Sequence, residues 1–397
     1  MPIGGRDNLD MSDRLVARMR PYQRTIFGEM SALATALGAV NLGQGFPDAG
    51  GPLEVRDAAQ RAIHDGLGDQ YPPAHGLPDL REAIAEHQAR FYGLRVDPRD
   101  GVVVATGAAE AIAASVLALV EPGQDVMMVD PYFDLYAAAI ALAGAQRVAV
   151  PLTGDTLRPD VAAMRAAVTP DTRMLLLNSP HNPSGIVFTR AELTELAAFA
   201  CEHDLLVLAD EAYEHLWFDD NEHVPISTLP GMWERTVTVG SGGKSFSFTG
   251  WKVGWASGPP DLISAVRVVR QHLSYVSSGP FQYAIATGLR LPDTYFERFR
   301  ADLAAKRDRL CDGLDELGLR MVAPQGTYFA TTDVRPLGFA DGDEFCRRAP
   351  HEAGVVAIPQ SALSDHAEAT GPYVRWAFCK QPGVLDEALS RLRGWLG

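Results

Sequence analysis

Residues 236–256, TVTVGSGGKSFSFTGWKVGWA, decide the fold class of this chain. Two short apolar runs, 236–239 and 253–256, flank a turn of small residues, and each has the length of a buried strand. Similar apolar runs lie upstream, at 102–105, 126–129, 174–177 and 205–209. Helix-forming stretches alternate with the runs, at 108–120, 135–143, 190–203 and 260–272. This alternation predicts a doubly wound α/β domain, with a mostly parallel sheet covered by helices on both faces.

The character of the sequence changes after about residue 290. A charged amphipathic helix is expected over 295–317, short strands over 327–332 and 373–378, and a final helix over 384–395. These elements predict a smaller α+β domain that follows the large one. The polar, glycine-rich start, residues 1–13, is predicted to be a disordered tail.

Composition excludes several classes of partner. The chain has 397 residues and a formal charge of −15, from 35 basic and 50 acidic residues. An acidic surface disfavours nucleic acid and anionic membranes, because both attract basic patches. The four cysteines form no C-x-x-C pair, so we expect free thiols and no metal site. The sequence shows neither a secretory signal nor an apolar run of about 18 residues, and the expected location is the cytoplasm.

Two lysines, Lys244 and Lys252, carry the strongest chemical signal. Gly243-Lys244-Ser245 has the tail of a phosphate-binding P-loop, but that motif needs a glycine where Thr238 stands. The P-loop interpretation is therefore rejected. A turn of small residues instead suits a lysine that forms an imine, with the second lysine bound to a phosphate, because burial and nearby cations keep an amine partly neutral. Two surface lysines beside a glycine-rich turn are the alternative for this stretch taken alone.

A carboxylate, Asp210, directly follows the apolar run 205–209. An uncompensated buried charge costs about 3–5 kcal/mol, so Asp210 requires a partner. The partner is either local, in a helix cap or an arginine pair, or it is the protonated pyridine nitrogen of a bound ligand. Tyr213 follows on the same loop and could direct its hydroxyl at that ligand.

Two further motifs follow predicted strands. In NSPHNPSG (178–185), Asn182 offers an amide that can donate to a phenolic oxygen and a carboxylate. In TGAAE (106–110), the backbone N–H groups of Ala108 and Ala109 begin a helix and can bind an anion. Each motif alone is equally an ordinary turn or helix start. Their order on successive strand ends is the specific signal, because ligands of such sheets bind beyond the carboxyl ends of the strands.

This constellation resembles the class I aminotransferases, pyridoxal 5′-phosphate (PLP) enzymes of fold type I, from about residue 22 to residue 395. The motifs NLGQGFPD (41–48) and QYPPAHG (70–76) resemble the branch of kynurenine, glutamine and methionine transaminases. Within that branch, residues 30–48, NSPHNPSG and GTYF (326–329) are most similar to actinobacterial N-succinyldiaminopimelate aminotransferases.

The resemblance implies three parts in the chain. An N-terminal segment, 14–47, packs on the small domain, a large PLP-binding domain covers 48–289, and the small C-terminal domain covers 290–397. The resemblance also implies a homodimer with composite active sites, since Tyr71 matches a tyrosine that the family sends into the partner subunit's phosphate site.

The cofactor positions of the family carry over by motif. Lys244 matches the Schiff-base lysine, Asp210 the partner of the pyridine nitrogen, and Tyr213 and Asn182 the donors to the ring hydroxyl. The residues that match the phosphate site are Ala108, Ala109, Ser241 and Lys252. Phe133 matches the aromatic residue that stacks on the ring face.

Substrate positions carry over in the same way. Arg375, in PYVRWAF, matches the arginine that binds the substrate α-carboxylate with Asn182, and a planar guanidinium does bind a carboxylate bidentately. Gly45 and Phe27 match positions where the N-terminal segment closes over the substrate. The stretch 277–279 departs from kynurenine-type relatives, because small residues replace an aromatic residue and a histidine, which disfavours an aromatic substrate.

Three basic side chains are expected to have lesser roles. His75 is expected to be structural or to line the substrate site. Arg267 and Arg270 are expected on an ordinary helix surface, although they could bind a distal carboxylate.

The implied activity moves an α-amino group between an L-amino acid, with glutamate as the expected donor, and a 2-oxo acid or N-succinyl-2-amino-6-oxopimelate. Lys244 would move the substrate Cα proton as a general base and then a general acid. The alternatives are a PLP-dependent C–S β-lyase, a kynurenine-, methionine- or glutamine-type transaminase, and a non-catalytic PLP-binding regulator. The last would need an attached basic DNA-binding module, which the acidic chain does not offer.

Overall fold

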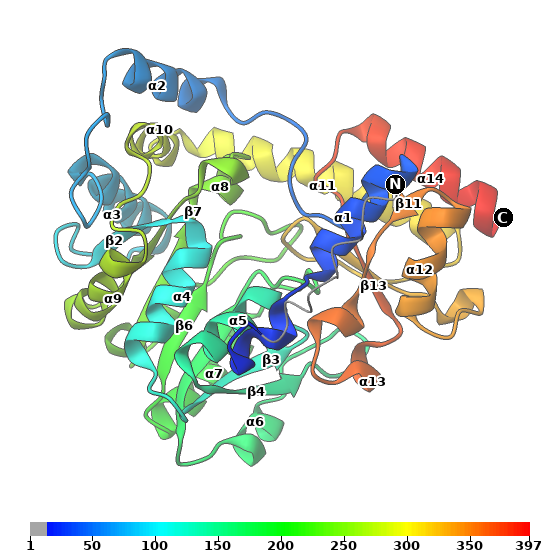
Figure 1. Cartoon of the computed structure of the whole chain (residues 1–397), viewed down its shortest axis with the longest axis horizontal. Coiled ribbons are helices and arrows are strands. Elements are labelled where there is room, and N and C mark those ends of the chain that lie inside the picture. The colour runs from blue at the N-terminus through cyan, green and yellow to red at the C-terminus, as the bar shows by residue number, and fades with distance from the viewer. Residues whose placement is uncertain (1–13) are drawn as a thin grey trace, which may run out of the picture.

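A seven-stranded sheet forms the centre of the molecule, with the strand order β2-β8-β7-β6-β5-β3-β4 (Figure 1). The computed structural model describes residues 14–397, so the tail predicted over 1–13 lies outside the described residues. The strands are β2 (Val102–Thr106), β3 (Asp125–Asp130), β4 (Gln146–Pro151), β5 (Thr172–Asn178), β6 (Leu206–Asp210), β7 (Thr236–Ser241) and β8 (Val253–Ser257). Neighbours pair in parallel except β8, which is antiparallel to both β2 and β7. The predicted fold class is confirmed.

Helices cover both faces of this sheet. On one face, Val103 of β2 packs with Ile112 of α4 in a core that also includes residues of α5 and α9. On the other face, Val104 packs with residues of α2, α3 and α10, and α7 covers the far strands. The helices are α2 (Leu53–His64), α3 (Pro78–Tyr92), α4 (Gly107–Leu119), α5 (Asp134–Ala143), α7 (Arg190–Glu202), α9 (Pro260–Leu273) and α10 (Gly279–Leu289). Because both faces are buried, the strands lack polar alternation, and their sequences are continuous apolar runs.

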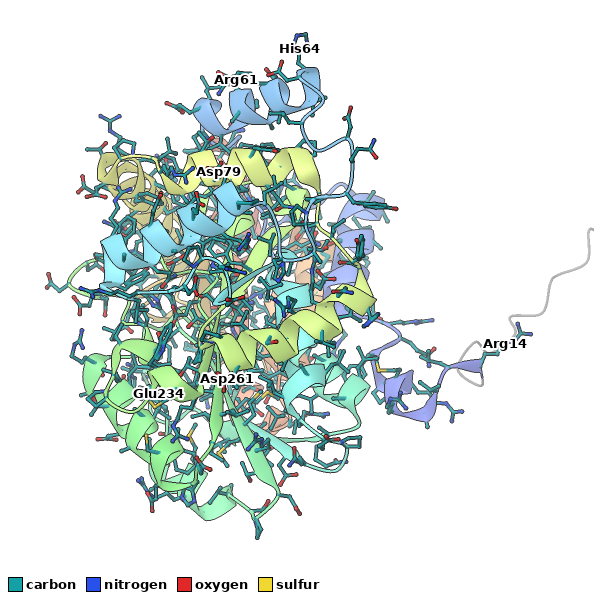
Figure 2. All side chains as sticks on the ribbon, turned by 90° about the vertical axis from the view of Figure 1, so that its left-hand side faces the viewer. Arg14, Arg61, His64, Asp79, Glu234 and Asp261 are labelled. Carbon is teal, nitrogen blue, oxygen red and sulfur yellow. The ribbon has the colours of Figure 1, made fainter. Side chains whose placement is uncertain are left out.

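The sequence missed several elements of this layer. Strand β4 lies at the sheet edge with half-exposed side chains, so its sequence, QRVAVP, has no long apolar run. Helices α2, α3, α6 (Val161–Ala167) and α10 were not predicted either. Figure 2 shows Arg61 and His64 projecting from α2 at the periphery of the molecule.

A smaller antiparallel sheet lies beside the large one, in the order β12-β13-β10-β9 (Figure 1). Its strands are β9 (Arg320–Val322), β10 (Phe329–Asp333), β12 (Ile358–Pro359) and β13 (Tyr373–Ala377). Helices α11 (Asp293–Glu316), α12 (Gly342–Glu352) and α14 (Pro382–Leu396) pack on it, around a core that includes Phe345 and Trp376. The helices and strands predicted after residue 290 are therefore present.

Helix α1 (Ile26–Leu37) and strand β1 (Val40–Asn41), near the start of the described chain, pack against its C-terminal part. Strand β1 pairs in parallel with β11 (Val355–Val356), and Figure 1 shows α1 beside α12. The chain then continues toward α2, and the backbone of residues 43–46 accepts hydrogen bonds from Arg375 and Lys380 in the C-terminal part of the chain. No helix within residues 14–397 is both long and apolar enough to cross a membrane.

Candidate active site

A cavity of about 360 Å³ lies beyond the carboxyl ends of β5, β6 and β7, and its size is typical of a small-molecule site. The predicted site residues that line it are Phe27, Gly45, Ala108, Ala109, Phe133, Asn182, Asp210, Tyr213, Ser241, Lys244, Lys252 and Arg375. The structure therefore brings together, at one edge of the sheet, residues that the sequence spreads from position 27 to position 375.

The loop after β5 is held in place by Asn178. In the register of the sheet, Asn178 at the end of β5 stands opposite Asp210 at the end of β6. Its Nδ2 donates to the backbone oxygen of Asp210 (2.8 Å), and its Oδ1 accepts from the backbone N–H of Asn182 (2.7 Å). One buried amide thus fixes Asn182 relative to Asp210.

Asp210 is buried at the back of the cavity. Tyr136 donates its hydroxyl to Oδ2 (2.6 Å), and the backbone N–H of Ala212 donates to Oδ1 (3.1 Å). Burial raises the pKa of the Asp210 carboxyl, although both hydrogen bonds and Lys244 act in the opposite direction. In the part of the chain that the structure describes, no basic side chain forms an ion pair with Asp210. A buried carboxylate that faces a cavity in this way fits a ligand with a positive charge, such as a protonated ring nitrogen.

Lys244 lies in the short helix α8 (Gly242–Ser245), at the turn after β7. Its Nζ donates to the hydroxyl of Tyr328 (2.6 Å), which in turn donates to the backbone oxygen of Gly45 (2.7 Å). Burial lowers the pKa of the Lys244 amine to about 8, against weaker opposing charges. A neutral amine is the nucleophilic form of lysine, so this site favours covalent bonding to a carbonyl carbon.

An anion cradle forms where α4 begins. Thr106 provides no side-chain cap, and the first residues of the helix, Ala108 and Ala109, line the cavity. A Cβ added at Gly107 would lie 3.2 Å from Lys252 Nζ, so this cation lies beside the helix start. A Cβ at Gly254 would lie only 2.4 Å from the backbone nitrogen of Ala108, which explains why glycine occupies that position in β8. Free N–H groups, the helix dipole and a lysine together fit a phosphate.

Arg375, on β13, is a buried cation without a carboxylate partner among residues 14–397. It donates to Oδ1 of Asn182 (2.8 Å) and to the backbone oxygen of Gly43 (2.7 Å), while its Nε has no partner in this region. The rings of Phe27 and Phe329 lie 4.8 Å and 4.0 Å from its Cζ. Burial lowers the pKa of this guanidinium to about 10, so it remains charged at neutral pH and can attract a substrate carboxylate.

Several predicted residues lie outside the cavity. Tyr71 is 80% exposed and packs edge-on against Tyr275 (5.4 Å between centroids) beside residues 277–279. His75 contacts the guanidinium of Arg267 and does not line the cavity. The expectation that Arg270 lies on a helix surface is wrong: its side chain is 1% exposed, donates to the backbone of 74 and 275, and lies 3.6 Å from Glu110. Helix α9 turns this position toward α4, and the sequence alone did not reveal that neighbour.

Some contacts of the site were not predicted. Tyr328 contacts Lys244, Tyr136 contacts Asp210, and Gln44 and Phe329 line the cavity. Tyr136 lies three residues after Phe133, and Tyr328 lies in GTYF, which was noted only for its family resemblance. A buried carboxylate and a buried amine each need a hydrogen-bond partner, and this requirement was the available signal.

Comparisons with known proteins identify the fold and the enzyme class. The family model for aminotransferase class I and II matches residues 38–392. The probable N-succinyldiaminopimelate aminotransferase DapC of Mycobacterium tuberculosis is 49% identical over 387 residues, covering 95% of this chain and 97% of that protein. The solved N-succinyldiaminopimelate aminotransferase from Mycobacterium tuberculosis superposes with a TM-score of 0.94 at 50% identity, over 96% of this chain and 100% of that one.

A second relative is more distant. The methionine aminotransferase of Escherichia coli is 36% identical over 373 residues, covering 93% of this chain and 95% of that protein. The cofactor of the family is PLP, and its ring nitrogen, aldehyde and phosphate correspond in chemistry to the buried Asp210, to Lys244 and to the cradle at α4. On fold, cavity and sequence together, the chain belongs to the class I and II aminotransferases.

Proposed function

We propose that this aminotransferase interconverts N-succinyldiaminopimelate and N-succinyl-2-amino-6-oxopimelate, with glutamate as the amino donor. The similarity to the mycobacterial relative, 49% identical along nearly the whole chain, supports this substrate. The main structural support for an amino acid substrate is Arg375, a buried cation in the same cavity as Lys244 and Asp210. Within residues 14–397 no carboxylate is paired with it, so it can bind the carboxylate of a substrate.

We further propose the roles of the residues that would hold PLP. Lys244 would bind its aldehyde carbon, Asp210 its ring nitrogen, and Tyr213 and Asn182 its ring hydroxyl. The positions assigned to the phosphate and the ring face are Ala108, Ala109, Ser241 and Lys252 and, for the ring, Phe133. When bound, PLP supplies an electrophilic carbon and an electron-withdrawing ring.

The protein's own contribution is orientation and proton transfer. Arg375 and Asn182 would bind the substrate α-carboxylate and so fix which bond of Cα faces the cofactor; such orientation can contribute several of the ~7–11 kcal/mol available to well-placed reactants. The free amine of Lys244 would take the proton from the substrate Cα as a general base and would then donate it, as a general acid, to the former aldehyde carbon of the cofactor. Its pKa of about 8 suits both steps, because a base near the working pH exchanges protons in either direction.

Adding single amino acids to the purified PLP form tests the substrate assignment. N-succinyldiaminopimelate and glutamate should each convert the pyridoxal absorption to that of pyridoxamine phosphate, whereas kynurenine and methionine should do so far more slowly. Equal or faster conversion by kynurenine or methionine would contradict the assignment. Release of pyruvate from cystathionine, without a 2-oxo acid acceptor, would identify a C–S β-lyase instead.

We also propose that the working unit is a homodimer in which Tyr71 completes the partner subunit's phosphate site. Tyr71 is exposed and outside its own cavity. Exposed apolar side chains accompany it near the ends of α2 and α9: Ile63 in α2, Leu67 just after α2, Leu273 in α9 and Tyr275 just after α9. The side of the molecule that carries α2 and α9 faces the viewer in Figure 2.

Mixing two inactive variants tests this arrangement. In a heterodimer of Lys244→Ala and Tyr71→Ala chains, a composite arrangement restores one site that has both residues, and activity appears on mixing. If Tyr71 serves its own chain, every site keeps a defect and mixing restores nothing.

The proposed division of the described chain into 14–47, 48–289 and 290–397 is tested by expressing 48–289 alone and measuring whether it folds.

A further inference from the structure

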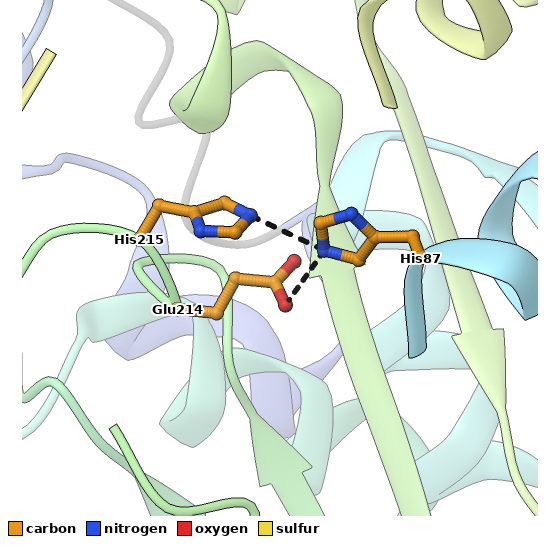
Figure 3. Close-up of side chains that lie close together, drawn as sticks. All are labelled: His87, Glu214 and His215. Carbon is orange, nitrogen blue, oxygen red and sulfur yellow. Dashed lines mark hydrogen bonds and ion pairs between the residues drawn. The ribbon is translucent and has the colours of Figure 1, made fainter. Parts of the chain in front are cut away.

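Three buried side chains form a cluster outside the cavity: His87 of α3, and Glu214 and His215 on the segment after β6 (Figure 3). Each is 2% exposed or less, and none lines the cavity described above. One ring nitrogen of each histidine and a Glu214 carboxylate oxygen all lie within 4.8 Å of one another. The aminotransferase reaction gives these three residues no role.

Two of the three distances within the cluster are close to those between neighbouring ligands of one metal ion, and the third, between a His215 nitrogen and a Glu214 oxygen, lies within 4.8 Å. His87 Nε2 lies 3.3 Å from Glu214 Oε2 and 3.2 Å from His215 Nε2. Tetrahedral zinc with bonds of about 2.0–2.1 Å holds neighbouring ligand atoms roughly 3.3–3.4 Å apart. A charge-assisted N–H···O hydrogen bond is shorter, typically about 2.7–2.9 Å. These two distances are therefore long for a charge-assisted hydrogen bond and close to the spacing of zinc ligands.

The number of protons available to the three side chains also favours a bound cation. The Nε2 atom of His87 carries at most one proton, and it faces a Glu214 oxygen, which accepts, and His215 Nε2, which donates or accepts according to its tautomer. If that nitrogen is unprotonated, it faces the carboxylate with a lone pair. The other nitrogen of His87, Nδ1, is buried and has no partner within residues 14–397. Figure 3 shows the carboxylate lying beside the gap between the two rings, whose planes are 85° apart. A cation among the three atoms would use all three lone pairs.

The buried carboxylates near the cluster have no lysine or arginine as an ion-pair partner among residues 14–397. A second buried carboxylate, Glu211, lies on the same segment and pairs only with His223 (3.2 Å) among the described residues. Within the same part of the chain, neither Glu211 nor Glu214 forms an ion pair with a lysine or an arginine. Tyr92 donates its hydroxyl to the same oxygen of Glu214 (2.8 Å), as an outer partner that orients a ligating carboxylate does. A divalent cation would compensate this buried negative charge.

We propose that His87, Glu214 and His215 bind one divalent transition-metal ion, Zn²⁺ by preference. Two imidazoles and one carboxylate are a ligand set that zinc accepts, whereas calcium and magnesium prefer oxygen ligands. The ion would connect α3 to the segment that also carries Asp210 and Tyr213, and would so stabilise the back wall of the cavity. The sequence did not predict this site, because His87 and His215 are far apart in the chain and lie in no metal-binding motif.

The test measures zinc in the PLP-loaded protein. Wild type, His215→Gln and the control His223→Gln are produced with zinc in the growth medium and desalted, and zinc per chain is measured by plasma mass spectrometry. His223 is a matched control, because it is also a buried histidine paired with a glutamate of the same segment. We expect about one zinc per chain in wild type and in His223→Gln, and at least a tenfold loss of retained zinc in His215→Gln.

Two further measurements keep the outcome independent of folding in the variant. In wild type, Co²⁺ added during refolding should give the intense visible absorption of four-coordinate cobalt, and a chelator should lower Tm without removing PLP. Wild-type protein that retains no zinc and shows no cobalt absorption overturns the proposal, and the contacts are then hydrogen bonds alone. Equal zinc in wild type and His215→Gln overturns it as well, because the metal then lies elsewhere.

Discussion

Replacing Tyr328 with phenylalanine removes one hydroxyl that connects two parts of the site. That hydroxyl accepts a hydrogen bond from Lys244 Nζ (2.6 Å) and donates one to the backbone oxygen of Gly45 (2.7 Å). Tyr328 is 1% exposed, so water does not readily replace the lost group. The hydrogen bond to the Tyr328 hydroxyl stabilises the protonated amine of Lys244. Removing that hydroxyl therefore favours the neutral amine.

The expected shift follows from the energy of a single hydrogen bond. A hydrogen bond to a charged group contributes about 1.5–3 kcal/mol, and one pKa unit corresponds to about 1.36 kcal/mol. The pKa of Lys244, which burial lowers to about 8 in the native protein, should therefore fall by roughly 1–2 units in Tyr328→Phe. The pKa of Lys244 can only fall, because burial and the loss of the hydrogen-bond acceptor both disfavour the charged ammonium.

The rate at which PLP recombines with the PLP-free protein measures this pKa. Covalent bonding requires the neutral amine, so the rate rises with pH through the pKa of Lys244. We expect a midpoint near 8 in wild type and a lower midpoint in Tyr328→Phe. Tyr295→Phe is the control, because its hydroxyl donates to the backbone of Ser245 and not to Lys244. An unchanged or higher midpoint in Tyr328→Phe would refute the reasoning, and a wild-type midpoint near the usual lysine value would refute the effect of burial.

Further substitutions test the other parts of the cavity. Lys244→Ala should lose the pyridoxal absorption of the bound form and the half-reaction; turnover at an appreciable fraction of the wild-type rate would contradict its role. Asp210→Ala should still bind PLP but lose most of kcat, so normal turnover would remove the argument for a paired ring nitrogen. Arg375→Lys should raise KM for amino acids at least tenfold, about 1.4 kcal/mol, because a lysine cannot bind a carboxylate bidentately; an unchanged KM would place the carboxylate elsewhere. Gly254→Ala should lower PLP affinity and cost about 1–3 kcal/mol of stability by overpacking against Ala108, which titration of PLP and thermal unfolding would measure.

Much of the fold could be predicted because its strands are buried on both faces. The six apolar runs that were singled out all became strands of the central sheet, and the rule about strand ends placed Asn182, Asp210 and Lys244 at one edge. Strand β4 was not predicted, because an edge strand exposes part of its surface and its sequence therefore shows no regular apolar pattern. Periodicity reports burial, and partial burial weakens it.

The contacts between distant segments could not be read from the sequence. Arg270 is a basic residue in an amphipathic helix, where an exposed position is the ordinary expectation, yet α4 covers it and Glu110 faces it. His87 and His215 meet because α3 packs beside the segment that follows β6. Such neighbours depend on how helices pack over the sheet, and nothing local to either residue indicates the other.

The segment 43–46 shows how a stretch without regular secondary structure can form a wall of the site. Three side chains from the C-terminal part of the chain donate to its backbone oxygens: Arg375 to Gly43 (2.7 Å), Tyr328 to Gly45 (2.7 Å) and Lys380 to Phe46 (2.8 Å). All three donors are buried, so the segment is fixed by hydrogen bonds that little water can replace. Two of these donors also contact other residues of the site: Arg375 contacts Asn182, and Tyr328 contacts Lys244. We therefore expect a substrate carboxylate that draws Arg375 toward itself to weaken a hydrogen bond that holds this segment in place.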